Sequence, residues 1–147
     1  MLSITTIMRV VVSLTSIPSR EKSVIKTVKS IQNGTVLPDS IYVNLSKYYP
    51  KFKKSPSENI VRELTSMGVI VNMTDEYGTL NDIMPILNTE KDSIAVIVTD
   101  NAEYSKYFLE YLLKGYREFG CAVGYSGICY PERVVDAYGR LGYIVSG

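Results

Sequence analysis

The chain has 147 residues and a formal net charge of +1, with 46% hydrophobic and 21% charged residues. This length suits one globular domain, and the composition argues against a disordered chain. A net charge near zero provides no long-range field for attracting nucleic acid, so we expect no nucleic-acid partner. The sequence contains no histidine, which excludes Ser/His/Asp and Cys/His catalysis and zinc sites with a histidine ligand.

Targeting signals and cysteine usage bear on the compartment. Residues 1–9 contain too short an apolar stretch for a secretory signal, and no segment approaches the roughly 18 apolar residues of a membrane span. The two cysteines, Cys121 and Cys129, are too few for a disulfide framework and do not form a CxxC pair. We therefore expect a single cytoplasmic domain over residues 1–147, without a transmembrane segment.

Segments with the two-residue period of a strand alternate with segments of helical period. In chain order, the pattern predicts a strand at 9–14, a helix capped by Ser19 and ended by Asn33, a strand at 41–45, a helix from Ile60 to Gly68, a strand at 69–73, a short helix at 83–87, a strand at 93–99, a helix at 104–119 and a strand at 122–125. From Pro131 we expect a short helix and then a strand at 143–145.

This alternation predicts an α/β fold with a mostly parallel sheet and helices on both faces. In such sheets, ligands bind at the carboxyl ends of the strands. The rule selects four loops as candidate binding loops, at 15–20, 46–54, 74–81 and 100–103.

The loop after the fourth predicted strand carries Asp100 and Asn101, directly behind a buried apolar run. A carboxylate at this place can hold Mg²⁺ or Mn²⁺ against a phosphate, because these cations prefer oxygen ligands. The same two residue types also form ordinary turns at strand ends. The dipeptide by itself therefore leaves a structural role open.

Two further loops offer polar groups. The loop at 15–20 combines hydroxyls, Arg20 and the start of a helix, which suits an anion such as a nucleotide phosphate, although helix capping explains the serines equally well. The loop that reads DEYG at 75–78 either borders a polar ligand or is a solvated turn. The glycine-rich phosphate motifs GxGxxG and GxxxxGK[ST] do not occur.

Four segments carry a family resemblance: VVVSLTSIPSREKSVIKTVKSI, VLPDSIYVNLS, DEYGTLNDIMPIL and SIAVIVTDNAEY. Together they resemble the GT-A type nucleotide-sugar glycosyltransferases, in particular the bacterial, algal and large-virus branch whose members begin with an SLTSIPSR-like segment. The similarity extends from about Arg9 to Tyr125. It implies a GT-A Rossmann-like fold, a nucleoside-diphosphate sugar donor, Mn²⁺ or Mg²⁺ on the diphosphate, and a glycan or other hydroxyl acceptor. A viral member would work in the host cytoplasm.

The resemblance also implies roles for individual residues. It places the donor-binding residues at Thr15, Arg20, Asp75, Tyr77, Thr99 and Asp100. Asp100 and Asn101 would bind the metal, but Asn101 stands where the family has an acid. Asp82 stands where the family has a lysine, and an aspartate there repels donor phosphates unless a metal intervenes.

The catalytic base is harder to place. In the family the chain continues beyond the fifth strand into the acceptor region, so we expect a shortened acceptor side here. Glu132 and Asp136 are the candidate bases, although solvated helix acids explain them as well. The departures at 82 and 101 leave a second function open, a non-catalytic domain of the same fold that binds a nucleotide sugar or a protein partner.

Overall fold

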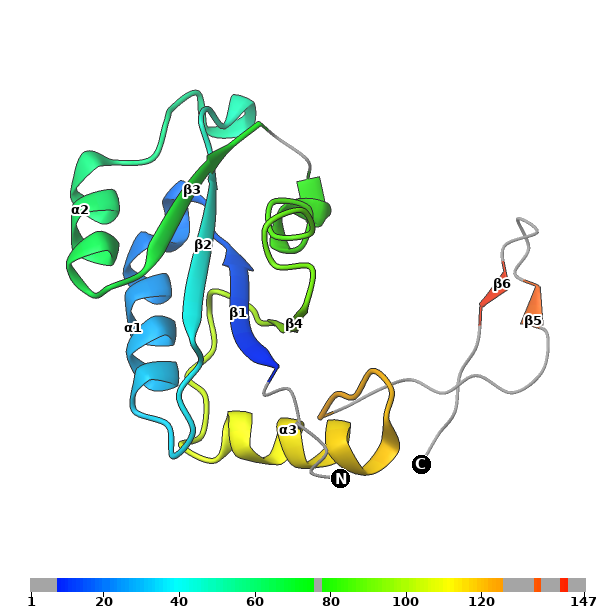
Figure 1. Cartoon of the computed structure of the whole chain (residues 1–147). Helices are drawn as coiled ribbons and strands as arrows, with labels where there is room; N and C mark the ends of the chain where they lie inside the picture. The colour runs from blue at the N-terminus through cyan, green and yellow to red at the C-terminus, as the bar shows by residue number, and fades with distance from the viewer. Residues whose placement is uncertain (1–7, 76–77, 126–133, 136–140, 143–147) are drawn as a thin grey trace. The chain divides into compact units, whose positions relative to one another are not determined.

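A parallel sheet organises the computed structural model of the chain, which describes residues 8–75, 78–125, 134–135 and 141–142. Its central strand is β1, and the strands are β1 (Arg9–Thr15), β2 (Ser40–Ser46), β3 (Ile70–Thr74) and β4 (Ser93–Ile97). All pairings are parallel, in the order β3-β2-β1-β4 (Figure 1). The chain moves outward from β1 to β3 and then returns across the sheet to place β4 on the other side of β1. The expected α/β class with a parallel sheet is thereby confirmed.

Two units divide the chain, Met1–Glu110 and Tyr111–Gly147, and we describe each by itself. The first unit contains the sheet. The second contains most of α3 (Phe108–Phe119) and an antiparallel pair, β5 (Val134–Val135) and β6 (Leu141–Gly142). Within the described ranges, no helix has both the length and the apolar character needed to cross a membrane.

Different segments cover the two faces of the sheet. Helices α1 (Glu21–Gln32) and α2 (Glu58–Ser66) lie on one face, and the connection that contains the 3-10 helix η3 (Gly78–Asp82) lies on the other (Figure 1). The 3-10 helices η1 (Pro18–Arg20) and η2 (Pro50–Phe52) follow β1 and β2, and each begins with a proline, whose fixed φ suits a first turn.

The composition of the sheet differs between these faces. Side chains alternate along a strand, so each strand contributes one set to the α1 and α2 face and the other set to the η3 face. The first face receives only apolar core residues from β1 and β2: Val12, Leu14, Ile41, Val43 and Leu45. On the η3 face, Val11 and Tyr42 form an apolar cluster with Ile86, but the residues nearer the carboxyl edge are polar.

A row of hydrogen-bonded polar side chains crosses the η3 face. Asn44 is fully buried, and its Nδ2 donates to Ser13 Oγ at 2.9 Å while its Oδ1 accepts from Asn72 Nδ2 at 3.0 Å. Ser13 is also fully buried, and its Oγ donates to the main-chain oxygen of Asp82 at 2.5 Å. Beside this row, Asn81 Nδ2 donates to Ser46 Oγ at 3.1 Å. Polar contacts therefore fasten η3 to the sheet.

A clamp of charged and hydroxyl groups lies at the amino edge of the sheet. Glu90 accepts hydrogen bonds from Tyr42 Oη at 2.6 Å and from Ser93 Oγ at 2.8 Å, and it forms an ion pair with Arg9 at 3.4 Å. These contacts, the Tyr42 hydrogen bond first, lower the pKa of Glu90 below its ordinary value of 4.5. The clamp ties the residues before β4 to β1 and β2.

Helix α3 begins later than the periodicity predicts because residues 104–107 bond to α1 and to the loop behind it. Tyr104 N donates to Ser30 Oγ at 2.9 Å, and the Lys106 main-chain oxygen accepts from Thr35 N at 2.8 Å. The Lys106 carbonyl would otherwise accept an intrahelical hydrogen bond, and the Tyr104 N–H, which has no intrahelical acceptor at a helix start, is satisfied by Ser30 instead. The local helical period is therefore overridden there.

Other elements also differ from expectation. Residues 83–87 form turns after η3 instead of an α-helix, because Pro85 has no main-chain N–H to donate. Residues 122–125 form no strand, and Val123 instead lies beside Gly115 of α3. Arg20, not Ser19, occupies the N-cap position of α1 because η1 precedes the helix. The expected helix from Pro131 and strand at 143–145 fall outside the described residues, apart from β5.

Removal of the buried Asn44 amide should destabilise the fold. Asn44→Ala leaves Ser13 and Asn72 without their buried partner, so we expect the free energy of unfolding to fall by about 2 kcal/mol. Asn59→Ala is the matched control, because Asn59 is exposed on α2 and its loss should change stability by less than about 0.5 kcal/mol. Urea denaturation measures both variants, and equal effects would contradict a structural role for Asn44.

The Glu90 clamp makes stability depend on pH. Because the pKa of Glu90 is lowered in the folded state, its contribution is present above pH 4.5 and is lost as the pH falls through the folded-state pKa. Glu90→Gln should therefore lower stability at pH 7 by about 1 kcal/mol and match the wild type in acid. Thermal unfolding at several pH values tests this, with exposed Glu63→Gln as the control. A difference independent of pH would disprove it.

Candidate functional site

The strand order selects one edge of the first unit as the candidate site. The order reverses between β1 and β4, because β1 connects toward β2 while β4 returns on its other side. In open parallel sheets, the loops that follow the two strands at such a reversal diverge and leave a crevice at their carboxyl ends. The residues that enter this edge come from the loop after β1, from η3 and from the loop after β4.

Asp100 is the buried charge at this edge. It is 3% exposed, although it follows β4 at the surface end of the sheet. Ser16 Oγ donates to its Oδ2 at 2.7 Å, and Arg20 Nη1 donates to its Oδ1 at 2.9 Å. The Arg20 side chain is 48% exposed, so the pair joins a buried carboxylate to a guanidinium that reaches solvent. The two loops are thereby connected through one carboxylate.

Asp82 is the second carboxylate at this edge. Its Oδ1 accepts a hydrogen bond from Thr15 N at 2.7 Å, and its main-chain oxygen accepts from Ser13 Oγ. Burial raises the pKa of Asp82, the negative charge of Asp100 adds to the rise, and the Thr15 hydrogen bond partly opposes it. Two carboxylates and one guanidinium therefore lie together at this edge.

Tyr49 fixes the loops around these groups. It is 4% exposed, its Oη donates to the Ser16 main-chain oxygen at 2.6 Å, and it accepts from Ser46 N at 2.9 Å. Thr15 Oγ1 donates to the Asn44 main-chain oxygen at 2.8 Å. The loops after β1 and β2 are therefore held to each other by buried hydrogen bonds, which limits movement of Ser16.

The structure brings together three of the residues that the sequence predicts for donor binding, namely Thr15, Arg20 and Asp100. Asp75 directly follows β3, two strands away from β1, where it is exposed and forms an ion pair with Lys47 at 3.0 Å. It lines a separate shallow pocket of about 360 Å³ beside β3.

The remaining predicted residues have different outcomes. Thr99 is exposed, and its Oγ1 donates to Asn101 Oδ1 at 2.6 Å, so these two residues bond to each other within the loop. Tyr77, Glu132 and Asp136 lie outside the described residues. The candidate bases therefore have no described position.

The metal assignment can be compared with these contacts. Both oxygens of Asp100 are engaged by Ser16 and Arg20, and the amide oxygen of Asn101 is engaged by Thr99. Among the residues whose positions are described, no three His, Cys, Asp or Glu side chains gather as a cation site would require. As arranged, Asp100 and Asn101 do not fit a metal site formed by the protein alone.

Two contributors were not predicted from the sequence as site residues. Ser16 lies within the expected 15–20 loop, but a serine before a proline-led helix is common and nothing marked its bond to Asp100. Asp82 was identified only as a departure from the family pattern. Asp82 lies beside Thr15 because the chain between β3 and β4 crosses back over β1.

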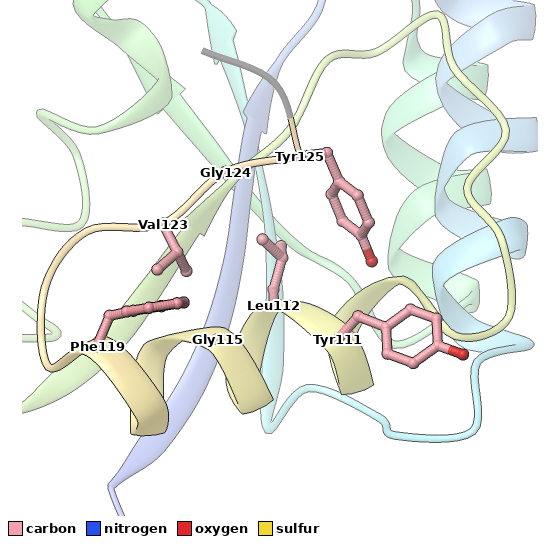
Figure 2. Close-up of a pocket in the computed structure, with 7 residues that line it drawn as sticks. All are labelled: Tyr111, Leu112, Gly115, Phe119, Val123, Gly124 and Tyr125. Carbon is pink, nitrogen blue, oxygen red and sulfur yellow. The ribbon is translucent and has the colours of Figure 1, made fainter. Parts of the chain in front are cut away.

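A separate hollow lies in the second unit, between α3 and residues 123–125 (Figure 2). Its volume is about 360 Å³, and it is lined by Tyr111, Leu112, Gly115, Phe119, Val123, Gly124 and Tyr125. The aromatic residues Tyr111, Phe119 and Tyr125 are 56%, 68% and 59% exposed. The lining contains no carboxylate, lysine or arginine, so it is poorly suited to a diphosphate.

Comparisons of the chain with protein-family models, with curated proteins and with solved structures give no match. A function for the chain therefore has to be inferred from the residues at the β1 and β4 edge.

Neutralising Asp82 should stabilise the protein. Because its pKa is raised in the folded state, the charged form destabilises the fold at pH 7, and protonation relieves this cost as the pH falls. Asp82→Asn keeps an oxygen for Thr15 N and should raise the Tm at pH 7, with a gain that shrinks toward acid pH.

Asp39→Asn provides the matched control for this measurement. Asp39 Oδ2 accepts from Val10 N at 2.7 Å, the same kind of bond at the opposite end of β1, but on the exposed surface. We expect little change in its Tm at any pH. A lower Tm for Asp82→Asn at pH 7 would show that the Asp82 charge stabilises the fold instead.

Proposed function

We propose that the first unit binds a nucleoside-diphosphate sugar at the edge between β1 and β4 and transfers the sugar to a hydroxyl acceptor, such as a glycan. The observation that carries this proposal is the Arg20–Asp100 ion pair at the reversal of strand order. It supplies a fixed cation where sheets of this kind bind nucleotides. The SLTSIPSR segment of the family resemblance is residues 13–20, the same loop.

Arg20 has the properties of a phosphate-binding residue. A guanidinium carries five N–H donors, and in the described part of the chain only Nη1 of Arg20 is engaged, by Asp100. Nearly half of the side chain is exposed, so the other donors can reach a phosphate. Asp100 holds the guanidinium in one orientation, which lowers the entropy that binding would otherwise cost.

The start of α1 supports the same assignment. This helix follows Arg20 directly, and no side chain caps its first main-chain N–H groups. Such groups attract anions at the amino end of a helix, where the helix dipole is positive. A diphosphate beside Arg20 would therefore lie at the positive end of the α1 dipole as well as beside a guanidinium.

Two carboxylates beside one guanidinium pose an electrostatic problem for a diphosphate. The charges of Asp82 and Asp100 oppose phosphate binding unless a cation accompanies the ligand. Mg²⁺ commonly binds through one or two carboxylates and completes its shell with phosphate oxygens and water. Since the described residues do not form a metal site by themselves, we propose Mn²⁺ or Mg²⁺ only as a counter-ion that the diphosphate brings with it.

A non-catalytic donor-binding domain is the second candidate. It is favoured by one observation, that Asn101 bonds to Thr99 and contributes no charge to the site. This candidate shares the binding step with the first and differs only in the absence of sugar transfer.

Titration calorimetry with UDP-linked and GDP-linked sugars, with and without Mn²⁺, tests the binding step. We expect binding that strengthens with Mn²⁺. Asp100→Asn keeps the shape of the side chain but removes the charge that orients Arg20, so the affinity should fall by roughly tenfold or more, as for a lost charge-assisted bond.

Asp39→Asn, at the opposite end of β1, should bind as the wild type does. No binding of either nucleotide sugar by the wild type would refute the proposal. Unchanged affinity in Asp100→Asn would refute the site. Binding without any release of the nucleoside diphosphate would favour the non-catalytic domain.

A further inference from the structure

A strongly basic loop follows β2, and the donor site described above does not use its charge. Residues 47–54, which we call the lysine loop, contain four lysines, and residues 47–57 contain no acidic residue, although the whole chain has a formal net charge of only +1. Lys47 is paired with Asp75. The other three lysines are exposed and form no ion pair within the described part of the chain: Lys51, Lys53 and Lys54. The lysine loop is therefore a patch of uncompensated positive charge.

Main-chain and ring contacts hold the lysine loop in one conformation. Its anchor is the buried Tyr49, whose N–H donates to the Lys54 main-chain oxygen at 2.9 Å and whose ring lies edge-on to that of Phe52. Phe52 N donates back to the Tyr49 main-chain oxygen at 3.0 Å, and Lys53 N donates to the Pro50 main-chain oxygen at 3.2 Å. The lysine side chains therefore extend from fixed main-chain positions, which lowers the entropy that binding would cost.

Lys53 has a main-chain conformation that favours glycine. Its φ is 50° and its ψ is 37°, in the left-handed region that a β-carbon disfavours. Among the described residues it is the one non-glycine residue with a positive φ, and the other positions of this kind are glycines: Gly68, Gly78 and Gly120. A glycine would make the same turn without strain. Strain of this kind persists at functional sites, which indicates that the charged side chain is retained for a ligand.

The lysine loop lies beside the candidate crevice. Tyr49 Oη donates to the Ser16 main-chain oxygen at 2.6 Å, and Ser16 Oγ donates to Asp100, the partner of Arg20. Tyr48 of the same loop is 51% exposed, so an aromatic residue accompanies the lysines at the surface. A ligand that extends from the crevice to this loop would meet both an aromatic residue and positive charges.

The negative charges at the same edge select among anionic partners. Asp75 follows β3, Asp82 bonds to Thr15 N and Asp100 follows β4. A nucleic acid has a phosphate on every nucleotide, and an anionic membrane presents a continuous negative surface, so either one would place negative charge against these aspartates. A glycan in which acidic and neutral sugars alternate can place its carboxylates on the lysines and its neutral sugars beside the aspartates.

We infer that the lysine loop binds an acidic glycan of this alternating kind and thereby holds the acceptor beside the crevice. The inference rests on the proposed sugar transfer, which supplies the reason for a glycan at this edge. Lys51, Lys53 and Lys54 bind its carboxylates, and Tyr48 contacts a sugar ring.

Titration calorimetry with a hyaluronan oligosaccharide, in which every second sugar carries a carboxylate, tests the binding at low ionic strength. We expect the wild type to bind this probe, to lose affinity as salt is added, and to show no binding of its uncharged methyl ester. The triple variant Lys51→Gln, Lys53→Gln, Lys54→Gln should bind about tenfold to hundredfold more weakly, since each exposed charge pair contributes about twofold to fivefold.

A second triple variant with the same change in net charge is the control. It carries Lys22→Gln, Lys26→Gln and Lys29→Gln, which remove three exposed lysines from α1. It should bind the oligosaccharide as the wild type does, and both triple variants should unfold within about 2 °C of the wild type because only exposed side chains change. Equal losses of affinity in the two triple variants would show that only the overall charge matters, which overturns the inference.

Single variants of Lys53 separate its charge from its conformation. Lys53→Gly removes both the charge and the strain, so the Tm should rise by roughly 2–4 °C while the affinity falls by about twofold to fivefold. Lys53→Gln should lose the same affinity without the gain in Tm, and Lys53→Arg should keep the affinity. A Lys53→Gly variant that is more stable and binds as the wild type does would overturn the role of the strained lysine and with it the inference.

The other outcomes distinguish this inference from the proposed function. If the wild type shows no salt-sensitive binding of the oligosaccharide, the inference is overturned, while donor binding, titrated separately, still stands. Tighter binding of single-stranded DNA or of phosphatidylserine vesicles than of the oligosaccharide overturns it in favour of a nucleic acid or a membrane. Failure to bind any nucleotide sugar refutes the proposed function, whereas the glycan affinity is measured without a donor.

Discussion

The hydrogen bonds of the Asn44 side chain hold the first unit together at its carboxyl edge. Its amide lies fully buried in a parallel sheet, where an unsatisfied polar group costs about 1–3 kcal/mol. Because the amide bonds to Ser13 on one side and Asn72 on the other, it requires β1, β2 and β3 to keep one register. Ser13 extends the same restraint to Asp82. The geometry of the candidate site therefore depends on a polar group in the core.

On the η3 face, this arrangement divides the sheet into an apolar region and a hydrogen-bonded polar region. Toward the amino edge, Val11, Tyr42 and Ile86 pack as an ordinary apolar cluster. Toward the carboxyl edge of the η3 face, directional hydrogen bonds replace apolar packing, whereas the α1 and α2 face stays apolar. Directional bonds fix atoms more narrowly than hydrophobic contact does, because they weaken steeply when their geometry is distorted. A region that has to hold charged groups at set distances benefits from such contacts.

Much of the fold could be predicted from apolar periodicity, because β1, β2, β3 and β4 each lie within one residue or two of their expected ranges. The site was predicted less well. Arg20 and Asp100 were found because both follow strands and suit phosphate chemistry. The position of Asp82 beside Thr15 could not be predicted from local pattern, since it depends on the path by which the chain crosses from β3 to β4. The hydrogen bonds of Asn44 could not be predicted either, because they depend on which strands lie on each side of β2.

The placement of β4 beside β1 has a consequence for how the protein acquires its site. Strands β1, β2 and β3 pair in the order in which they occur along the chain, whereas Arg20 meets Asp100 across a separation of 80 residues. Contacts between residues far apart in the sequence form late, because the entropy cost of closing a long loop comes before the contacts can stabilise the chain. A chain that ends after β3 contains all three of these strands but lacks Asp100, and therefore the Arg20–Asp100 ion pair. The Arg20–Asp100 pair therefore depends on β4 having joined the sheet, and cannot form from the first three strands alone.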